Sequence, residues 1–174
     1  MENKKGERMK IHCGNCDYDK ALKGKKTKMK YDVSGLDYVT LDSVTVYTCP
    51  HCAEKFYDFG NVEKLNATIA EYIATQEEPL SGKEIRFIRK FLGYDTTMFA
   101  KEMLKIKTET LSRMENEKQE CSETLDQFIK VLALTKRPDR NYDLHEKIKA
   151  KKHPAPERIL VKTKGENFLV QAFA

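Results

Sequence analysis

Two short motifs, Cys13-Gly14-Asn15-Cys16 and Cys49-Pro50-His51-Cys52, contain four of the five cysteines in this chain of 174 residues. Each Cys-x-x-Cys motif brings two thiolates to one side of a metal ion, and two such motifs complete a tetrahedral site. The residues between the motifs are numerous enough to form a small supporting sheet. The four cysteines therefore predict a structural Zn²⁺ site that organises the N-terminal part of the chain.

The main alternative for these motifs is a redox-active pair of the thioredoxin-like kind. Such a pair lies at a strand-to-helix junction of a larger α/β domain, for which the N-terminal part of this chain is too short. His12 and His51 lie beside the motifs and could replace a ligand, but four cysteines already complete the set. The fifth cysteine, Cys121, precedes a predicted helix and is expected to be a small buried residue.

The composition is that of a folded and strongly charged protein, with 40% hydrophobic and 34% charged residues. No stretch approaches the roughly 18 apolar residues of a membrane span, and the first residues lack the apolar region of a signal peptide. We therefore expect a cytoplasmic protein without membrane contact, whose thiols stay reduced and bind metal. We expect no enzyme activity, because no residue spacing positions a nucleophile and no Gly-rich run cradles phosphates.

The N-terminal region is expected to be a small β domain. Residues 27–33 and 38–47 alternate polar residues with β-branched or aromatic ones, as half-buried strands do. From Asn61, apolar residues recur at helical spacing, and residues 76–79 interrupt that pattern. The predicted organisation is an α+β fold with a zinc-binding domain (1–60), a connecting helix and linker (61–79), an all-α helix-turn-helix domain (80–135) and a basic C-terminal extension (136–174).

Four short helices are predicted in the third of these regions. Ser81 and Glu84 form a capping box at the start of the first helix, and Thr96 is the expected N-cap of the second. The third helix is predicted over residues 108–116, and Ser122 can cap the fourth. The apolar face expected for the fourth helix consists of Leu125, Phe128, Ile129 and Leu132.

The third helix has the features of a DNA-recognition helix. If its apolar residues face inward, Arg113 points outward and can pair bidentately with guanine, while Glu109 could accept from cytosine. Thr97 begins the second helix, where unpaired backbone N–H groups favour a phosphate contact. The alternative for Arg113 is a surface ion pair with Glu117 or Glu109. The predicted DNA-binding residues are Thr97, Thr108, Glu109, Ser112 and Arg113.

The C-terminal extension carries ten Lys or Arg against five Asp or Glu. This basic bias fits a contact with phosphates, although such runs are more often simply solvated. Residues 159–162 and 168–173 flank a turn-forming segment and predict a β-hairpin. Because an isolated hairpin is marginally stable, it should dock on its own N-terminal domain, a second protomer or a partner protein.

Taken together, residues 11–135 resemble the MqsA family of antitoxins, also described as YgiT-type zinc-finger/helix-turn-helix proteins. The resemblance rests on the two cysteine motifs, the connecting helix and segments 96–100 and 111–116, which are similar to the xenobiotic-response-element type of helix-turn-helix. It implies an N-terminal zinc domain that neutralises a cognate toxin, often an mRNA-cleaving ribonuclease. It also implies a C-terminal domain that forms a homodimer and represses its own operon by binding palindromic operator DNA.

The chain departs from this family at two positions of the third helix. An Asn and an Arg read the operator in that family; Arg113 matches the Arg, but Glu109 occupies the Asn position. A carboxylate repels phosphates and does not pair with adenine as Asn does, so the resemblance implies a different operator. Glu117 also stands where a Gly commonly closes the helix. A toxin-free repressor of a mobile element would show the same two domains, and this is the alternative function.

Overall fold

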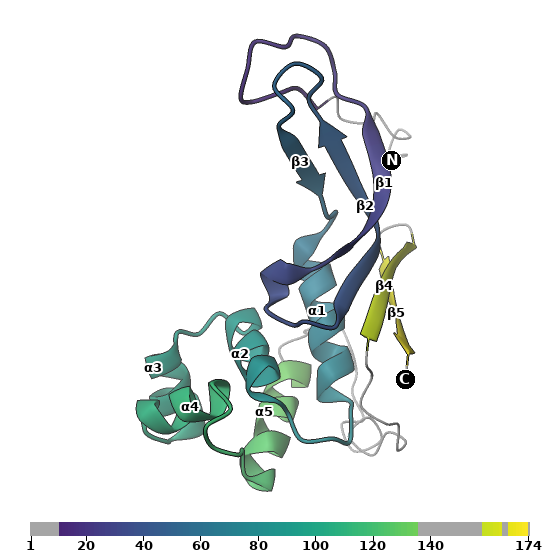
Figure 1. The fold of residues 1–174 in the computed structure, drawn as a ribbon. Coiled ribbons are helices and arrows are strands. Elements are labelled where there is room, and N and C mark those ends of the chain that lie inside the picture. The colour runs from purple at the N-terminus through teal and green to yellow at the C-terminus, as the bar shows by residue number, and fades with distance from the viewer. Residues whose placement is uncertain (1–10, 136–157, 165–166, 174) are drawn as a thin grey trace, which may run out of the picture.

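The computed structural model describes residues 11–135, 158–164 and 167–173 and has a mixed α+β fold (Figure 1). Within these ranges, every helix is too short or too polar to cross a membrane. The elements in chain order are β1 (Gly24–Lys30), η1 (Asp32–Ser34), β2 (Val39–Thr48), β3 (Lys55–Asp58), α1 (Val62–Ala74), α2 (Gly82–Phe91), α3 (Thr96–Met98), η2 (Phe99–Leu104), α4 (Thr108–Glu115), α5 (Glu123–Thr135), β4 (Arg158–Lys164) and β5 (Asn167–Phe173).

The long strand β2 is the centre of the sheet. One side of β2 pairs antiparallel with β1, whose register shifts between Thr27 and Met29. The other side pairs antiparallel with β3 near the end of β2 and parallel with β4 near its start. The strands predicted at 27–33 and 38–47 are confirmed in the main. The first ends at Lys30, because residues 32–34 form a 3₁₀ turn closed by Gly35 at φ 75°.

The predicted C-terminal hairpin is confirmed, and it docks on the chain's own N-terminal sheet. Strand β5 pairs antiparallel with β4, and β4 lies beside β2 with Val39 opposite Ile159. The backbone N–H of Ile159 donates to Tyr38 O at 2.9 Å, and Ile159 and Val161 are buried. Residues 136–157 of the basic extension lie outside the described residues.

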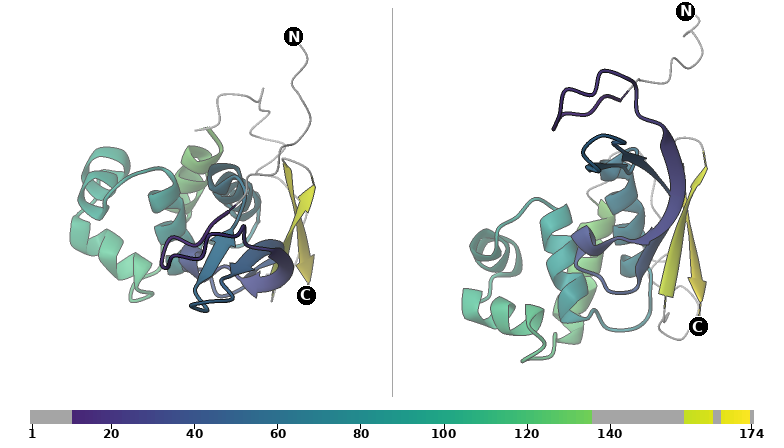
Figure 2. Two further views of the ribbon diagram at one scale, coloured as in Figure 1. Left: turned by 90° about the horizontal axis from the view of Figure 1, so that it is seen from above. Right: turned by 45° about the horizontal axis from the view of Figure 1, so that its top comes forward.

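Helix α1 lies between the sheet and the other helices. Asn61 caps it by accepting a hydrogen bond from Lys64 N at 2.9 Å, as a helix start requires. The two views in Figure 2 place α2–α5 on one side of α1 and the β4–β5 hairpin on the other. One cluster of buried hydrophobic residues runs from the sheet through α1 to the helices, and the α1 side chains in it are Leu65, Ile69, Ala70, Ile73 and Ala74.

The capping chemistry of the helical part follows the sequence with one correction. The capping box of Ser81 and Glu84 is present at the start of α2. Thr96 was the expected N-cap of the next helix, but this prediction is wrong: the Asp95 carboxylate accepts from Met98 N at 2.9 Å. An aspartate one residue earlier supplies a charged acceptor, which the helix N-terminus favours. Thr96 is therefore the first residue of α3.

The apolar face predicted for the last helix is wrong in part. Ile129 is fully buried, and Leu125 and Leu132 are half-buried and pack against the core, but Phe128 is 41% exposed. The polar pair Asp126 and Lys130 also faces inward, which the sequence did not predict. The Ser122 hydroxyl accepts from Leu125 N at 3.4 Å, in agreement with its predicted role as a cap.

A buried ion pair on α5 holds the linker between α1 and α2. Lys130 Nζ lies 2.9 Å from Asp126 Oδ2 and donates to the carbonyls of Gln76 and Glu78 at 3.0 and 2.8 Å. The second Asp126 oxygen accepts from Leu80 N at 2.6 Å. The side chains of Lys130 and Asp126 are 1% and 5% exposed, and the partners of both charged groups lie within the protein. Such partners are needed because a buried charge loses its hydration by water.

Removing this lysine should destabilise the whole fold. We expect Lys130→Ala to lower the free energy of unfolding by about 3–5 kcal/mol, because it leaves the Asp126 charge buried without a partner. Lys90→Ala, which removes an exposed lysine from α2, should change stability by only about 0.5 kcal/mol. Guanidinium unfolding followed by circular dichroism measures both. Equally small changes in the free energy of unfolding for the two variants would contradict the proposed contribution of the ion pair to stability.

Candidate metal centre and the exposed face of α4

The four predicted cysteine ligands meet at one point. The Sγ atom of Cys13 lies 3.5 Å from that of Cys16 and 3.6 Å from that of Cys52. The Sγ atoms of Cys16 and Cys49 are 3.6 Å apart, and all four sulfurs lie within 4.8 Å of one another. All four cysteines are free thiols rather than disulfides. His12 and His51 do not belong to this cluster.

Two loops of different origin build the cluster, at the end of the sheet drawn at the top of Figure 1. One loop precedes β1 and is tied by a hydrogen bond from Leu22 N to Ile11 O at 2.7 Å. The other loop joins β2 to β3, where Cys49 N donates to Glu54 O at 2.9 Å. Ala53 adopts a left-handed conformation with φ 61°, which lets the chain turn tightly after Cys52. The Cys-x-x-Cys spacing and the hairpin turn together aim both pairs at one centre.

Hydrogen bonds already favour a thiolate at this site. Burial raises the pKa of the Cys49 thiol, but backbone N–H groups of Cys52 and His51 and the neighbouring thiols outweigh it and lower the pKa to about 6. At Cys16 the backbone N–H of Tyr18 lowers the pKa, yet burial and the hydrogen bonds to the other three thiols raise it to about 12. One thiolate is thus stabilised, and a cation is needed before all four can ionise.

The sulfur geometry fits a tetrahedral metal ion. Metal–sulfur bonds of about 2.3 Å in a tetrahedron place the sulfurs about 3.8 Å apart, close to the separations of 3.5 and 3.6 Å. Asn15 Nδ2 lies 3.9 Å from Cys52 Sγ, where it can orient this ligand from outside the cluster. The arrangement could therefore hold a metal ion with four protein ligands, which would leave no open position for substrate.

The predicted DNA-binding residues lie on α4 and at the start of α3. Glu109, Ser112 and Arg113 are exposed on α4, Thr108 at its first position is half-buried, and Thr97 is exposed on α3. Leu111 and Met114 of α4 are buried, as predicted. The segment that joins η2 to α4 turns at Lys105, which has φ 54°. The two short helical segments are therefore connected by three residues, with one face of α4 turned outward.

No ion pair ties Arg113 to Glu109 or Glu117 in the described parts of the chain. The alternative interpretation of Arg113 as half of a surface salt bridge therefore receives no support from the structure. Glu117, at φ 57°, closes α4 in the left-handed conformation in which Gly is common. Lys118 N donates to Arg113 O at 2.8 Å, which completes a Schellman motif without a glycine.

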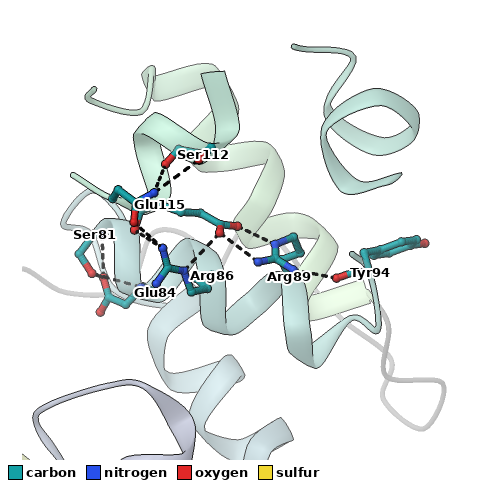
Figure 3. A network of polar contacts seen from close by, with 8 residues as sticks. Ser81, Glu84, Arg86, Arg89, Tyr94, Ser112 and Glu115 are labelled. Carbon is teal, nitrogen blue, oxygen red and sulfur yellow. Dashed lines mark hydrogen bonds and ion pairs between the residues drawn. The ribbon is translucent and has the colours of Figure 1, made fainter. Parts of the chain in front are cut away.

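An ion-pair network fixes α4 on α2, and the sequence analysis missed it (Figure 3). The buried Glu115 carboxylate accepts from Arg89 Nε at 2.6 Å and from Arg89 Nη2 at 3.0 Å. Arg86 adds a longer contact from Nε at 3.3 Å and also donates to Glu115 O and Asn116 Oδ1. The spacing of Arg86, Arg89 and Glu115 carries no local signal for this contact, because the partners are 26 and 29 residues apart.

Close packing accompanies the network. A Cβ atom added to Gly82, the first residue of α2, would lie 2.3 Å from Met114 O, so only glycine fits there without a shift. The side-chain nitrogen of Asn116 donates to Ser112 O at 2.7 Å, and its side-chain oxygen accepts from Arg86. Asn116 therefore connects the end of α4 to α2. The outward face of α4 is thus held rigidly from its inner side.

Comparison of the chain with family models, with curated protein sequences and with solved structures finds no match.

The cysteine cluster leads to a direct test. We expect Cys49→Ser to reduce bound metal from about one ion per chain to well below that, because a tetrahedral structural site needs all four ligands. Cys121→Ser is the matched control: this half-buried thiol lies outside the cluster and should leave the metal content unchanged. Elemental analysis of protein purified without chelator measures both. Full metal content in Cys49→Ser would contradict the assignment.

Proposed function

We propose that this protein is a zinc-containing, DNA-binding antitoxin of a type II toxin-antitoxin system. In this proposal it neutralises a cognate toxin and represses its own operon as a homodimer, and it has no catalytic activity. The observation that carries the DNA-binding part is the outward face of α4. Arg113 on this face forms no ion pair within the described residues, and the buried Arg89–Glu115 pair lies beneath it. The antitoxin part rests on the resemblance of the cysteine motifs and of segments 96–100 and 111–116.

Zinc is the proposed occupant of the four-cysteine site. Tetrahedral sets of four thiolates bind zinc or iron in proteins, and a closed site of this kind next to a small sheet serves folding rather than catalysis. The sheet around the cluster is largely exposed, so it gains stability from the ion. The same elemental analysis identifies the ion, and iron in place of zinc would contradict this part of the proposal.

We propose that α3, η2 and α4 form a helix-turn-helix with α4 in the major groove. Arg113 would pair with guanine, Glu109 could accept from cytosine N4, and the Ser112 hydroxyl would reach base or phosphate. Thr97 would contact a phosphate, and exposed lysines at 101, 105 and 107 surround the turn and favour the DNA backbone. The Arg89–Glu115 pair supports this use of α4, because a recognition helix must keep a fixed orientation to select bases.

The cognate toxin is proposed to be an mRNA-cleaving ribonuclease bound by the N-terminal part of the chain. A toxin-free repressor would use the same DNA-binding face, so only the presence of a toxin partner distinguishes the two functions. An adjacent small reading frame whose product arrests growth, and whose arrest this protein relieves on co-expression, would support the antitoxin. Growth arrest that persists on co-expression would favour the repressor.

Helix α5 offers a face for the proposed homodimer. Leu125, Phe128 and Leu132 of α5 are spaced three and four residues apart, and Cys121 lies four residues before Leu125, which is the pattern of a helix–helix seam. Phe128 is 41% exposed, and the other three are half-buried. A dimer is also what operator binding requires, since one recognition helix makes few base contacts and a palindrome has two half-sites.

Substitution of Arg113 tests the recognition face. We expect Arg113→Ala to weaken operator binding by about 1–3 kcal/mol and to leave binding to random DNA nearly unchanged, because a bidentate base contact exists only where the right guanine is present. Arg113→Lys should lose most of the same discrimination, since an ammonium cannot form the two parallel hydrogen bonds. Fluorescence anisotropy on both DNAs provides the measurement.

Lys90→Ala is the control for charge, because it removes one exposed positive charge from α2 rather than α4. It should affect operator and random DNA alike. If Arg113→Ala also weakens the two DNAs equally, Arg113 contacts only phosphates and the assigned recognition face is wrong.

Substitution of Phe128 tests the dimer. We expect Phe128→Glu to shift the chain from dimer to monomer at micromolar concentration and to weaken operator binding by at least about tenfold, because it buries a charge in an apolar seam. Val33→Glu is the matched control, since Val33 is an exposed hydrophobic residue on η1, away from α5. Sedimentation velocity distinguishes the two states. A Phe128→Glu chain that remains dimeric would exclude this seam.

A further inference from the structure

Strands β1, β2 and β3 line a hollow of about 350 Å³ that the proposed function does not use. We name it the sheet hollow. It lies next to the cysteine cluster, because Thr48 precedes Cys49 and the β2–β3 loop carries the second cysteine pair. Its lining residues are Lys25, Thr27 and Met29 of β1, Val46 and Thr48 of β2, and Lys55 and Tyr57 of β3.

The strand register arranges these side chains in rows across the sheet. Lys25 is opposite Val46 on β2, and Val46 is opposite Tyr57 on β3, so one row runs from an ammonium over an apolar floor to an aromatic ring. Lys55 is opposite Thr48 in the adjacent row. Neighbouring strands lie about 4.8 Å apart, so Lys25 and Tyr57 stand about 10 Å apart across the hollow.

The charge of the sheet hollow favours an anionic ligand. Two of the lining residues are lysines and none is acidic. The chain from Lys20 to Lys30 adds five further lysines without an Asp or Glu, and all of them are exposed. Lysines on an edge strand also discourage pairing with another strand, so the anion would bind across the face rather than extend the sheet.

The aromatic part of the sheet hollow selects among anions. Tyr57 is 47% exposed, and its ring is stacked with that of Phe59 at a centroid distance of 6.2 Å and an interplanar angle of 14°. An exposed ring beside lysines and an apolar floor can stack a base while the ammonium groups hold the adjoining phosphates. A duplex keeps its bases stacked inside and offers none to such a ring.

We propose that the sheet hollow binds single-stranded nucleic acid, with a base on Tyr57 and phosphates on Lys25 and Lys55. This site is separate from the proposed duplex-binding face of α4. Its chemistry requires no particular sequence, because every base has a stacking face. RNA and DNA strands share this chemistry, and the probes below distinguish them.

The test uses the full chain and a fluorescently labelled oligouridine of about ten nucleotides, with anisotropy read between about 50 and 200 mM salt. Lys25→Gln/Lys55→Gln should weaken binding and flatten the slope of log K against log salt by about 1.4, at about 0.7 for each lost phosphate contact. Tyr57→Ala should weaken binding at least about fivefold, and Tyr57→Phe should retain it because the stacking ring remains. An oligothymidine of equal length shows whether the sugar matters.

Lys26→Gln/Lys28→Gln is the matched control, since it removes the same charge from exposed positions of β1 that do not line the hollow. It should flatten the slope much less and should not weaken stacking. Thermal melting of each variant confirms that the sheet is intact. Because Arg113 lies on α4, Arg113→Ala should leave single-strand binding unchanged, so this inference and the proposed function fail separately.

Three results would overturn the inference. The first is no binding of either oligonucleotide at about 50 mM salt. The second is an equal loss in the control and in Lys25→Gln/Lys55→Gln, which would indicate diffuse attraction rather than a site. The third is displacement of the probe by a poly-glutamate peptide at lower concentration than by unlabelled oligouridine, which would assign the sheet hollow to an acidic protein segment.

Discussion

The buried pair Asp126–Lys130 holds the two halves of the molecule in one arrangement. The three protons of a lysine ammonium need three acceptors in a dry interior, and here one carboxylate and two linker carbonyls supply them. If the linker moved away from α5, the buried Lys130 ammonium would lose two of its hydrogen-bond acceptors, which is energetically costly. Because the same linker sets where α2 begins, this pair also determines where α4 lies relative to α1 and the sheet.

A second buried charge, that of Glu115, fixes the position of α4 on α2. Glu115 is anchored to Arg89 by two hydrogen bonds, and Arg89 also donates to Tyr94 O at 3.0 Å. Ser81, at the other end of α2, is fixed by its capping box with Glu84. The Tyr38 hydroxyl also donates to Glu84, and Lys83 pairs with Asp37. Helix α2 is thus held by α4 on one side and by the two residues that precede β2 on the other.

The sequence predicted the features that depend on local chemistry. Fixed spacing predicted the cysteine cluster, the period of apolar residues predicted α1, and capping residues predicted the starts of α2 and α5. It missed features that depend on distant partners. Asp126 and Lys130 are four residues apart, which is the spacing of an ion pair on the surface of a helix. The apolar side chain of Phe128 suggested that its own face of α5, rather than theirs, is buried. The parallel pairing of β4 with β2 joins segments about 120 residues apart, for which a single sequence carries no register signal.

The position of the hydrophobic core indicates which part of the sheet a metal ion at the cysteine cluster would stabilise. Val39, Leu41 and Val44 in the first half of β2 belong to the core shared with α1 and β4. Beyond Val44, β2 pairs only with the exposed strands β1 and β3 in the described residues and leads directly to Cys49. Apolar burial stabilises the first half of β2, whereas the second half depends on backbone pairing and on the cysteine cluster. A metal ion bound at the cluster would therefore stabilise mainly the sheet beyond Val44, and Val46, Thr48, Lys55 and Tyr57 of the sheet hollow lie in that part.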